Sequence, residues 1–170
     1  EKKKKTEETD GTGCFRHRFC VIMGTKKQEE ELYMKIAVAC DHGAFEYKEI
    51  VKEMLTEMGH EVEDFGCHGS ESVDYPDYAG PAAQSVADGK NDKGIVICGT
   101  GIGVSIAANK IKGIRCALCG DPVSAKLTRE HNDSNVLAMG QRIIGVELMK
   151  EIVRVWINTE FSHDERHQRR

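Results

Sequence analysis

This chain has no long apolar run, no strong charge of one sign and few aromatic side chains. No stretch approaches the ~18 apolar residues that a membrane-spanning helix needs, so the sequence predicts no membrane segment. The net charge is −4, which disfavours nucleic acid and anionic membranes as partners. With 170 residues, of which 39% are hydrophobic, the chain is nevertheless long enough for one domain with a sizeable core.

The chain also lacks the cysteine and histidine spacing of a zinc site, although it contains seven cysteines. Cys116 and Cys119 have the C-x-x-C spacing, but they lie in an apolar strand-like run, where alternation sends them to opposite faces. An odd number of cysteines in a chain of this kind favours reduced thiols. We therefore predict no metal site and a cytoplasmic location.

Residues 1–33 differ from the rest of the chain because they are charged, polar and rich in turn formers. Their apolar run, residues 19–23, is shorter than the about 7–15 residues of a signal-peptide core. A clean α/β pattern begins only at Met34, and residues 28–31 could be the translation of a purine-rich ribosome-binding sequence. We expect residues 1–33 to be a disordered extension or a mis-assigned start, and residues 34–170 to form the domain.

From Met34 onward, strand-like and helix-like segments alternate. Strand patterning covers residues 35–40, 61–65, 93–98, 114–119 and 136–139. Helical periodicity covers residues 44–58, 78–88, 104–110, 121–129 and 145–158. The alternation predicts an α/β fold, a doubly wound Rossmann-like or flavodoxin-like three-layer sandwich with about five parallel strands and a C-terminal amphipathic helix. A loop is expected at residues 70–81, and a polar, basic tail at residues 161–170.

The most informative motif is the apolar run that ends at Cys98, followed by Gly-Thr-Gly-Ile-Gly at residues 99–103. Such a turn lets successive backbone N–H groups converge, and the dipole of the next helix adds positive potential. The pattern therefore predicts an anion hole with a thiol at its rim. It is neither a dinucleotide fingerprint, because the third glycine comes one residue early, nor a P-loop. The alternative is a turn that serves packing only, beside an inert core cysteine.

Other polar clusters follow the expected strands. Since ligands bind at the carboxyl ends of parallel strands, we expect Asp41-His42, the turn after Cys98 and Gly120-Asp121 at one edge of the sheet. We place the polar block 129–135, Arg142 and the basic end of the chain at the same edge. One thiol, two histidines and several arginines suited to phosphate would then meet.

These motifs together resemble ribose-5-phosphate isomerase type B, a family close to galactose-6-phosphate isomerase subunits. The matching stretches are residues 39–43, 74–76, 97–103 with 105–110, 113–115, 129–137, 140–142 and 166–170. The resemblance covers the chain from Met34 to its C-terminus. Residues 1–33 have no counterpart, and many relatives continue slightly beyond Arg170.

The resemblance implies a homodimer, or a tetramer, that isomerises a sugar phosphate without metal or cofactor, in a site shared between two subunits. Its substrate would be ribose 5-phosphate, converted to ribulose 5-phosphate through an enediolate. Cys98 would be the base, with Thr100 beside it, and His131 would help to open the furanose ring. Asp41 would hold sugar hydroxyls, and Asn132 would contact the reacting oxygens. The remaining substrate contacts would be an enediolate cradle and a phosphate clamp, formed by Gly99, Gly101, Ile102, Gly103, Arg142, Arg166 and Arg170, with help from His42 or His167.

Three alternatives remain open on the sequence. The same chemistry could act on a six-carbon phosphate such as galactose 6-phosphate or allose 6-phosphate. A non-catalytic phosphosugar- or nucleotide-sensing module would tolerate a missing base, whereas this chain has Cys98. A thiol redox protein would need a resolving cysteine near Cys98, and none is nearby in the sequence. The presence of Cys98 and His131 in one chain favours a self-sufficient homo-oligomer over a heteromeric enzyme.

Overall fold

The computed structural model describes residues 33–170, so the predicted extension lies outside the described residues except for Tyr33. The strands are β1 (Lys35–Cys40), β2 (Glu61–Asp64), β3 (Lys93–Cys98), β4 (Cys116–Leu118) and β5 (Val136–Gly140). The helices are η1 (His42–Ala44), α1 (Phe45–Glu57), α2 (Pro76–Ala87), α3 (Ile102–Asn109), α4 (Pro122–Asn132), α5 (Val146–Asn158) and α6 (Glu165–Arg169). No helix in this described part has the length and apolarity that a membrane crossing requires.

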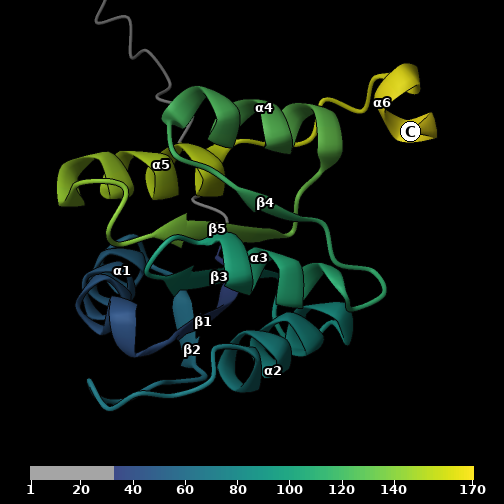
Figure 1. Cartoon of the computed structure of the whole chain (residues 1–170). Coiled ribbons are helices and arrows are strands. Elements are labelled where there is room, and N and C mark those ends of the chain that lie inside the picture. Colours follow the sequence, from purple (N-terminus) through teal and green to yellow (C-terminus); the bar gives the residue numbers. More distant parts are fainter. Residues whose placement is uncertain (1–32) are drawn as a thin grey trace, which may run out of the picture. The chain divides into compact units, whose positions relative to one another are not determined.

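The five strands form one parallel sheet in the order β2-β1-β3-β5-β4 (Figure 1). The central strands β1 and β3 are almost fully buried apolar runs, as expected of parallel strands covered on both faces. The register pairs Cys98 of β3 with Gly140 of β5. The predicted doubly wound α/β fold with five parallel strands is therefore confirmed.

The two faces of the sheet are packed with side chains of different size. The face covered by α1, α4 and α5 is lined mainly by large apolar residues: Ile36, Val38, Ile95, Ile97, Leu137, Met139, Met149, Ile152 and Trp156. The face covered by α2 and α3 is lined mainly by small ones: Ala37, Ala39, Ala79, Ala82, Ala83, Ala108 and Ala138. Cys119 belongs to the first core and Cys116 packs against the second, which confirms that the C-x-x-C pair is split between the faces.

Helix α2 begins earlier than the sequence predicts. Residues 70–81 were expected to be a loop, yet the helix starts at Pro76. Proline suits the first helical position because its fixed φ fits the helix and its missing N–H leaves no bond unmade. Pro122 begins α4 in the same way, and there Asp121 caps the helix by accepting a hydrogen bond from Ser124 N at 2.9 Å. The basic tail also contains a short helix, α6, rather than being wholly irregular.

One prediction about the ends of the sheet is wrong. Asp41, Cys98 and Gly120 do follow strands at the carboxyl edge, as expected. The polar block 129–135, however, lies at the amino edge, because α4 runs back across the sheet and the block leads into the start of β5. The C-terminal tail lies there too, since Ser162 N donates to the carbonyl oxygen of Glu130 at 3.1 Å.

Candidate active site

Cys98 lies at the carboxyl end of β3 with its thiol facing the glycine turn. Its sulfur accepts a hydrogen bond from Gly101 N at 3.0 Å, and its side chain is only 4% exposed. Gly101 has a positive φ of 78° and is the residue from which α3 starts, a conformation that glycine adopts without strain. The sulfur is thus beside the positive end of a helix, where negative charge is stabilised.

Close packing holds the turn in place. A Cβ added to Gly101 would lie 2.8 Å from the carbonyl carbon of Met139, and one added to Gly140 would lie 2.5 Å from that of Thr100. A Cβ on Gly103 would meet the ring of Tyr75 at 2.7 Å. The turn is therefore enclosed between the end of β5 and the Tyr75 ring, and even a methyl group would displace it.

Asp41 and His42 follow β1 at the same edge. Asp41 accepts a hydrogen bond from Gly43 N at 2.9 Å and thereby caps η1. His42 Nδ1 accepts one from Val73 N at 3.1 Å. Since a backbone N–H can only donate, this contact requires the lone pair on Nδ1 and places the ring proton on Nε2. His42 therefore presents an N–H donor at Nε2.

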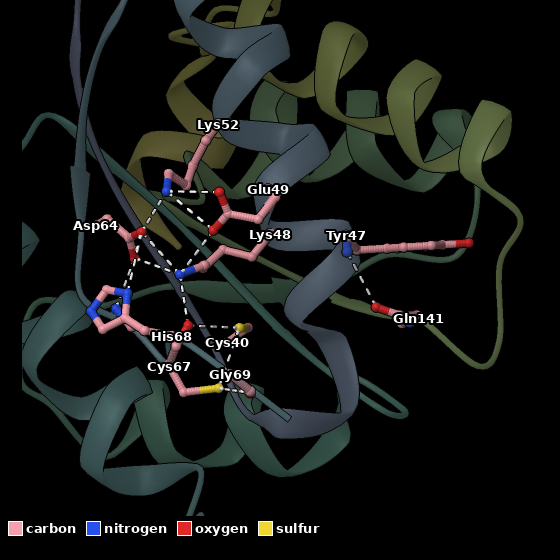
Figure 2. Close-up of polar contacts among 11 residues, drawn as sticks. Cys40, Tyr47, Lys48, Glu49, Lys52, Asp64, Cys67, His68, Gly69 and Gln141 are labelled. Atoms are coloured by element: carbon pink, nitrogen blue, oxygen red, sulfur yellow. Dashed lines mark hydrogen bonds and ion pairs between the residues drawn. The ribbon is translucent and has the colours of Figure 1, made fainter. Parts of the chain in front are cut away.

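Arg142 completes this group from the end of β5. Its backbone N donates to Gly99 O at 3.0 Å, and its guanidinium lies over the turn, where a Cβ on Gly99 would be 3.4 Å from Nε. The loop that carries Arg142 is tied to α1, because Tyr47 N donates to Gln141 Oε1 at 3.2 Å (Figure 2). An exposed guanidinium fixed next to the anion hole is suited to a phosphate.

Lys48 of α1 is fully buried next to the carboxyl edge of the sheet, where it contacts the segment that follows β2 (Figure 2). Lys48 Nζ contacts both carboxylate oxygens of Asp64 at 2.9 Å and the carbonyl oxygen of Cys67 at 2.7 Å. Burial acts to raise the pKa of Asp64, but the hydrogen bonds from Lys52 and Lys48 outweigh it and lower the pKa. Cys67 N donates to Cys40 O at 2.9 Å, so the network holds the chain segment adjoining Asp41.

Sequence analysis missed the role of Lys48. The available signal was its spacing, since Lys48 shares one helix face with Val51 and Leu55, both of which are buried. A lysine on an apolar face indicates a buried charge that needs partners. Its partners could not be read from the sequence, because Asp64 ends β2 and Cys67 follows it, far along the chain from Lys48.

A second group of predicted site residues lies at the opposite edge of the sheet. His131 and Asn132 end α4, and the His131 ring packs against His167 of α6 with centroids 4.4 Å apart. Ser162 Oγ lies 2.9 Å from His167 Nδ1. Burial, and then the neighbouring His131 and Arg166, lower the pKa of His167. His131, Asn132, His167 and Arg170 line a cavity of about 620 Å³.

The predicted site residues thus form two half-sites within one chain. The cysteine half-site contains Asp41, His42, Cys98, Gly99, Thr100, Gly101, Ile102, Gly103 and Arg142. The histidine half-site contains His131, Asn132, Arg166, His167 and Arg170. The chain does not bring the two half-sites together, because they lie at opposite edges of its sheet. Among residues 33–170, no three His, Cys, Asp or Glu side chains are grouped as metal ligands would be.

Comparisons with known proteins identify the family. A family model described as Ribose/Galactose Isomerase matches residues 36–170. A putative sugar phosphate isomerase of Bacillus subtilis is 57% identical over 81% of this chain and 92% of its own length. Ribose-5-phosphate isomerase B of Escherichia coli is 52% identical over 80% of this chain and 91% of its own length.

A solved structure shows the same fold. Ribose-5-phosphate isomerase B of Clostridium thermocellum superimposes with a TM-score of 0.78 at 48% identity, covering 80% of this chain and 92% of that one. This chain therefore belongs to the ribose/galactose isomerase family.

Proposed function

We propose that this isomerase interconverts D-ribose 5-phosphate and D-ribulose 5-phosphate through an enediolate, with Cys98 as the base. The observation that carries the proposal is the Cys98 sulfur, which accepts the N–H of Gly101 at the mouth of the glycine turn. Asp41 and Arg142 flank this turn from β1 and β5. A base, an oxyanion hole and a phosphate-binding arginine are the groups that the reaction needs.

The first step is opening of the furanose ring. His131 takes the proton of the C1 hydroxyl, and the ring oxygen gains a proton as its bond to C1 breaks. This leaves an open-chain aldehyde with a hydroxyl on C4. Asp41 accepts hydrogen bonds from sugar hydroxyls, and its position is fixed by the cap that it forms with Gly43 N.

The second step is proton transfer between carbons. The Cys98 thiolate removes the proton from C2, and the electron pair moves to the C1 oxygen to form the enediolate. The proton of the C2 hydroxyl moves to the C1 oxygen, and the thiol returns its proton to C1 as the oxygen on C2 becomes the ketone. Backbone N–H groups of residues 99–103 stabilise the oxyanion, with Thr100 in that turn and Asn132 at the oxygens next to the reacting carbons. Preorganised donors of this kind lower the barrier because they need not reorganise as charge develops.

The complete site requires two copies of the chain, because its two half-sites lie at opposite edges of one sheet. Arg142 of one copy and Arg166 and Arg170 of the other would bind the phosphate, with His42 Nε2–H as a further donor. Several exposed apolar side chains along the β4 edge fit contact with a second copy: Ile102, Ile106, Leu118, Val123 and Leu127. An exposed apolar patch beside an edge strand favours self-association. The assembly is a homodimer, or a tetramer built from such dimers.

The substrate is tested by a side-by-side assay of sugar phosphates. Relatives 42% and 38% identical to this chain are named D-erythrulose-4-phosphate isomerase and galactose-6-phosphate isomerase subunit LacB, so four- and six-carbon substrates belong in the assay with allose 6-phosphate. We expect the highest kcat/KM with ribose 5-phosphate. A higher value with a six-carbon phosphate would reassign the substrate, and binding of all of them without turnover would indicate a sensing module.

The base is tested by alkylation with iodoacetamide. Modification should abolish turnover, and ribose 5-phosphate should slow the inactivation because it covers Cys98. Cys119 provides the matched control, because it is a buried thiol, as Cys98 is, and belongs to neither half-site. The Cys119→Ser variant should keep its activity and remain sensitive to iodoacetamide.

A further inference from the structure

The turn that follows His131 and Asn132 is held by an unusual set of charges. Asp133 has a φ of 47° and a ψ of 47°, a left-handed conformation that glycine, asparagine and aspartate adopt more readily than other residues. Its two carboxylate oxygens bind different arginines. Oδ1 is 2.9 Å from Arg129 Nη1, and Oδ2 is 3.0 Å from Arg115 Nη2.

Arg115 reaches this turn from the segment before β4. Its Nε donates to two carbonyl oxygens, that of Asn132 at 3.0 Å and that of Asp133 at 2.9 Å. It therefore binds the main chain of Asn132 directly, in addition to the neighbouring carboxylate. Arg115 N also donates to Asn135 Oδ1 at 2.8 Å, which fixes the base of the arginine against the same turn.

Arg129 binds the turn from the buried side, with only 7% of its surface exposed. Its Nη1 donates to Ser134 O at 2.6 Å, and its Nε donates to Thr159 O at 3.0 Å. Thr159 begins the segment that leads to α6 (Figure 1). One guanidinium therefore joins the end of α4 to the start of the tail that carries His167.

We infer that Arg115, Arg129 and Asp133 form a turn clamp that positions His131 and Asn132 for ring opening. The clamp holds the main chain of the turn, because Arg115 and Arg129 donate to its carbonyl oxygens, so we treat its members as positioning residues. Its larger effect falls on ring opening, the step that His131 performs, because proton transfer at Cys98 responds to the clamp only through Asn132, one of several donors to the oxyanion. The inference rests on the proposed function for its kinetic test, while the orientation of His131 is measurable by itself.

Three substitutions at Asp133 distinguish the effect of the left-handed backbone from the effect of the carboxylate. Asp133→Gly keeps the left-handed conformation and loses the carboxylate, Asp133→Asn keeps the shape and loses the charge, and Asp133→Ala loses both. Glu151→Ala is the control, because it removes an exposed carboxylate bound to Arg154 on α5. Melting temperatures should fall most for Asp133→Ala, since alanine does not favour the left-handed conformation.

Two rates should respond differently. Consumption of ribose 5-phosphate includes ring opening, whereas deuterium exchange into C1 of ribulose 5-phosphate does not, because that sugar cannot close a furanose ring when its O5 carries phosphate. In all three Asp133 variants, kcat for ribose 5-phosphate should fall about tenfold or more, as expected for a displaced catalytic group. The exchange rate should fall much less, and Glu151→Ala should change neither rate.

A second measurement does not depend on turnover. The NMR signals of the His131 ring, assigned with His131→Asn, should shift between the parent protein and Asp133→Gly, and their response to inorganic phosphate should change. An unchanged ring signal together with a normal ratio of the two rates in Asp133→Gly would overturn the clamp. If the parent consumed no ribose 5-phosphate, the proposed function would fail, and the ring signal would still decide whether the clamp exists.

Discussion

The two edges of the sheet present functional groups of different origin. At the carboxyl edge, the cysteine half-site is mostly backbone, with N–H groups of a glycine turn fixed by contacts of β5 and Tyr75. At the amino edge, the histidine half-site consists of long side chains at the end of α4 and on α6. In the proposed reaction, backbone N–H groups would stabilise the developing charge, whereas side chains would bind the phosphate.

A lysine lies near each edge, Lys48 fully buried and Lys93 partly buried, and the two differ in their partners. Lys48 is paired with Asp64 at 2.9 Å. Lys93, at the amino end of β3, has no ion pair within residues 33–170; its Nζ donates to Ile157 O at 3.2 Å and lies 5.2 Å from the centre of the Trp156 ring. Burial, and then the charge of Arg129, lower the pKa of Lys93 to about 8. Burial without a carboxylate partner disfavours the charged form.

The largest expected effect tests whether the two half-sites act together. Cys98→Ala should reduce kcat by about 10²–10⁴-fold, the usual contribution of a general base, while ribose 5-phosphate still binds. A chain truncated after Asp164 should also be poorly active, because it lacks Arg166 and Arg170. Mixing the two variants should restore about a quarter of parental activity, since half of randomly paired dimers are mixed and each of these has one intact site.

Failure of the mixture to regain activity, with exchange of subunits confirmed by native mass spectrometry, would place both half-sites of one active site in the same chain. That result would contradict the arrangement of the sheet edges. A Cys98→Ala variant with near-normal kcat would instead show that Cys98 is not the base.

The second effect concerns the buried pair behind the cysteine half-site. Asp64→Leu should cost about 3 kcal/mol of unfolding free energy, because it leaves the buried Lys48 charge with only the exposed Glu49, whose Oε1 is 3.2 Å from Lys48 Nζ. Lys48→Met should cost less, and the double variant should recover much of the loss. Chemical denaturation measures all three, with Lys150→Met as a surface control that should change stability by less than about 1 kcal/mol.

The pH dependence of stability checks the same pair. The folded state lowers the pKa of Asp64, so its contribution is full above the unfolded pKa near 3.8 and is lost as the pH falls through the lower folded value. The parent should therefore lose more stability on acidification than Asp64→Leu does. Parallel pH profiles would show that the network does not favour the charged carboxylate.

The third effect concerns phosphate binding at the amino edge. Arg166→Gln and Arg170→Gln should each raise KM for ribose 5-phosphate about tenfold, because a charge-assisted hydrogen bond contributes ~1.5–3 kcal/mol. Arg169→Gln is the matched control, since Arg169 is an exposed arginine of the same helix. Added salt should raise KM in the parent. Equal KM values for the three variants would show that neither Arg166 nor Arg170 binds the phosphate.

The smallest effect concerns Lys93. Its folded pKa of about 8 lies below the ordinary 10.5, so between these values the unfolded chain binds more protons and stability should rise with pH. Lys93→Met should remove this rise and increase stability at pH 7 by about 1–2 kcal/mol. A destabilised variant would show that the contacts with Ile157 and Trp156 outweigh the desolvation of the charge.

Much of the fold followed from local pattern. The apolar runs around Ile36 and Ile95 are buried strands, and the small residues after Cys98 begin a helix. The ends of helices and strands were less predictable, since α2 begins at Pro76, inside the segment that was expected to be a loop. The predicted location of residues 129–135 was wrong. Motif spacing gives only the order along the chain, whereas the direction of α4 decides which edge of the sheet these residues reach. Contacts of Arg129 with Thr159 and of Lys48 with Cys67 join distant segments and leave no local signal.

The unequal faces of the sheet have a consequence for how such chains can diverge. Large side chains around Trp156 can exchange volume with their neighbours, because cores tolerate swaps that conserve total volume. The alanines beneath α2 and α3 have no smaller counterpart except glycine, and any larger residue would lift α3 away from Cys98. Substitutions among relatives should therefore accumulate on the Trp156 face in compensating pairs. On the alanine face, which also contains Cys98, substitutions should be rare, even at alanines that belong to neither half-site.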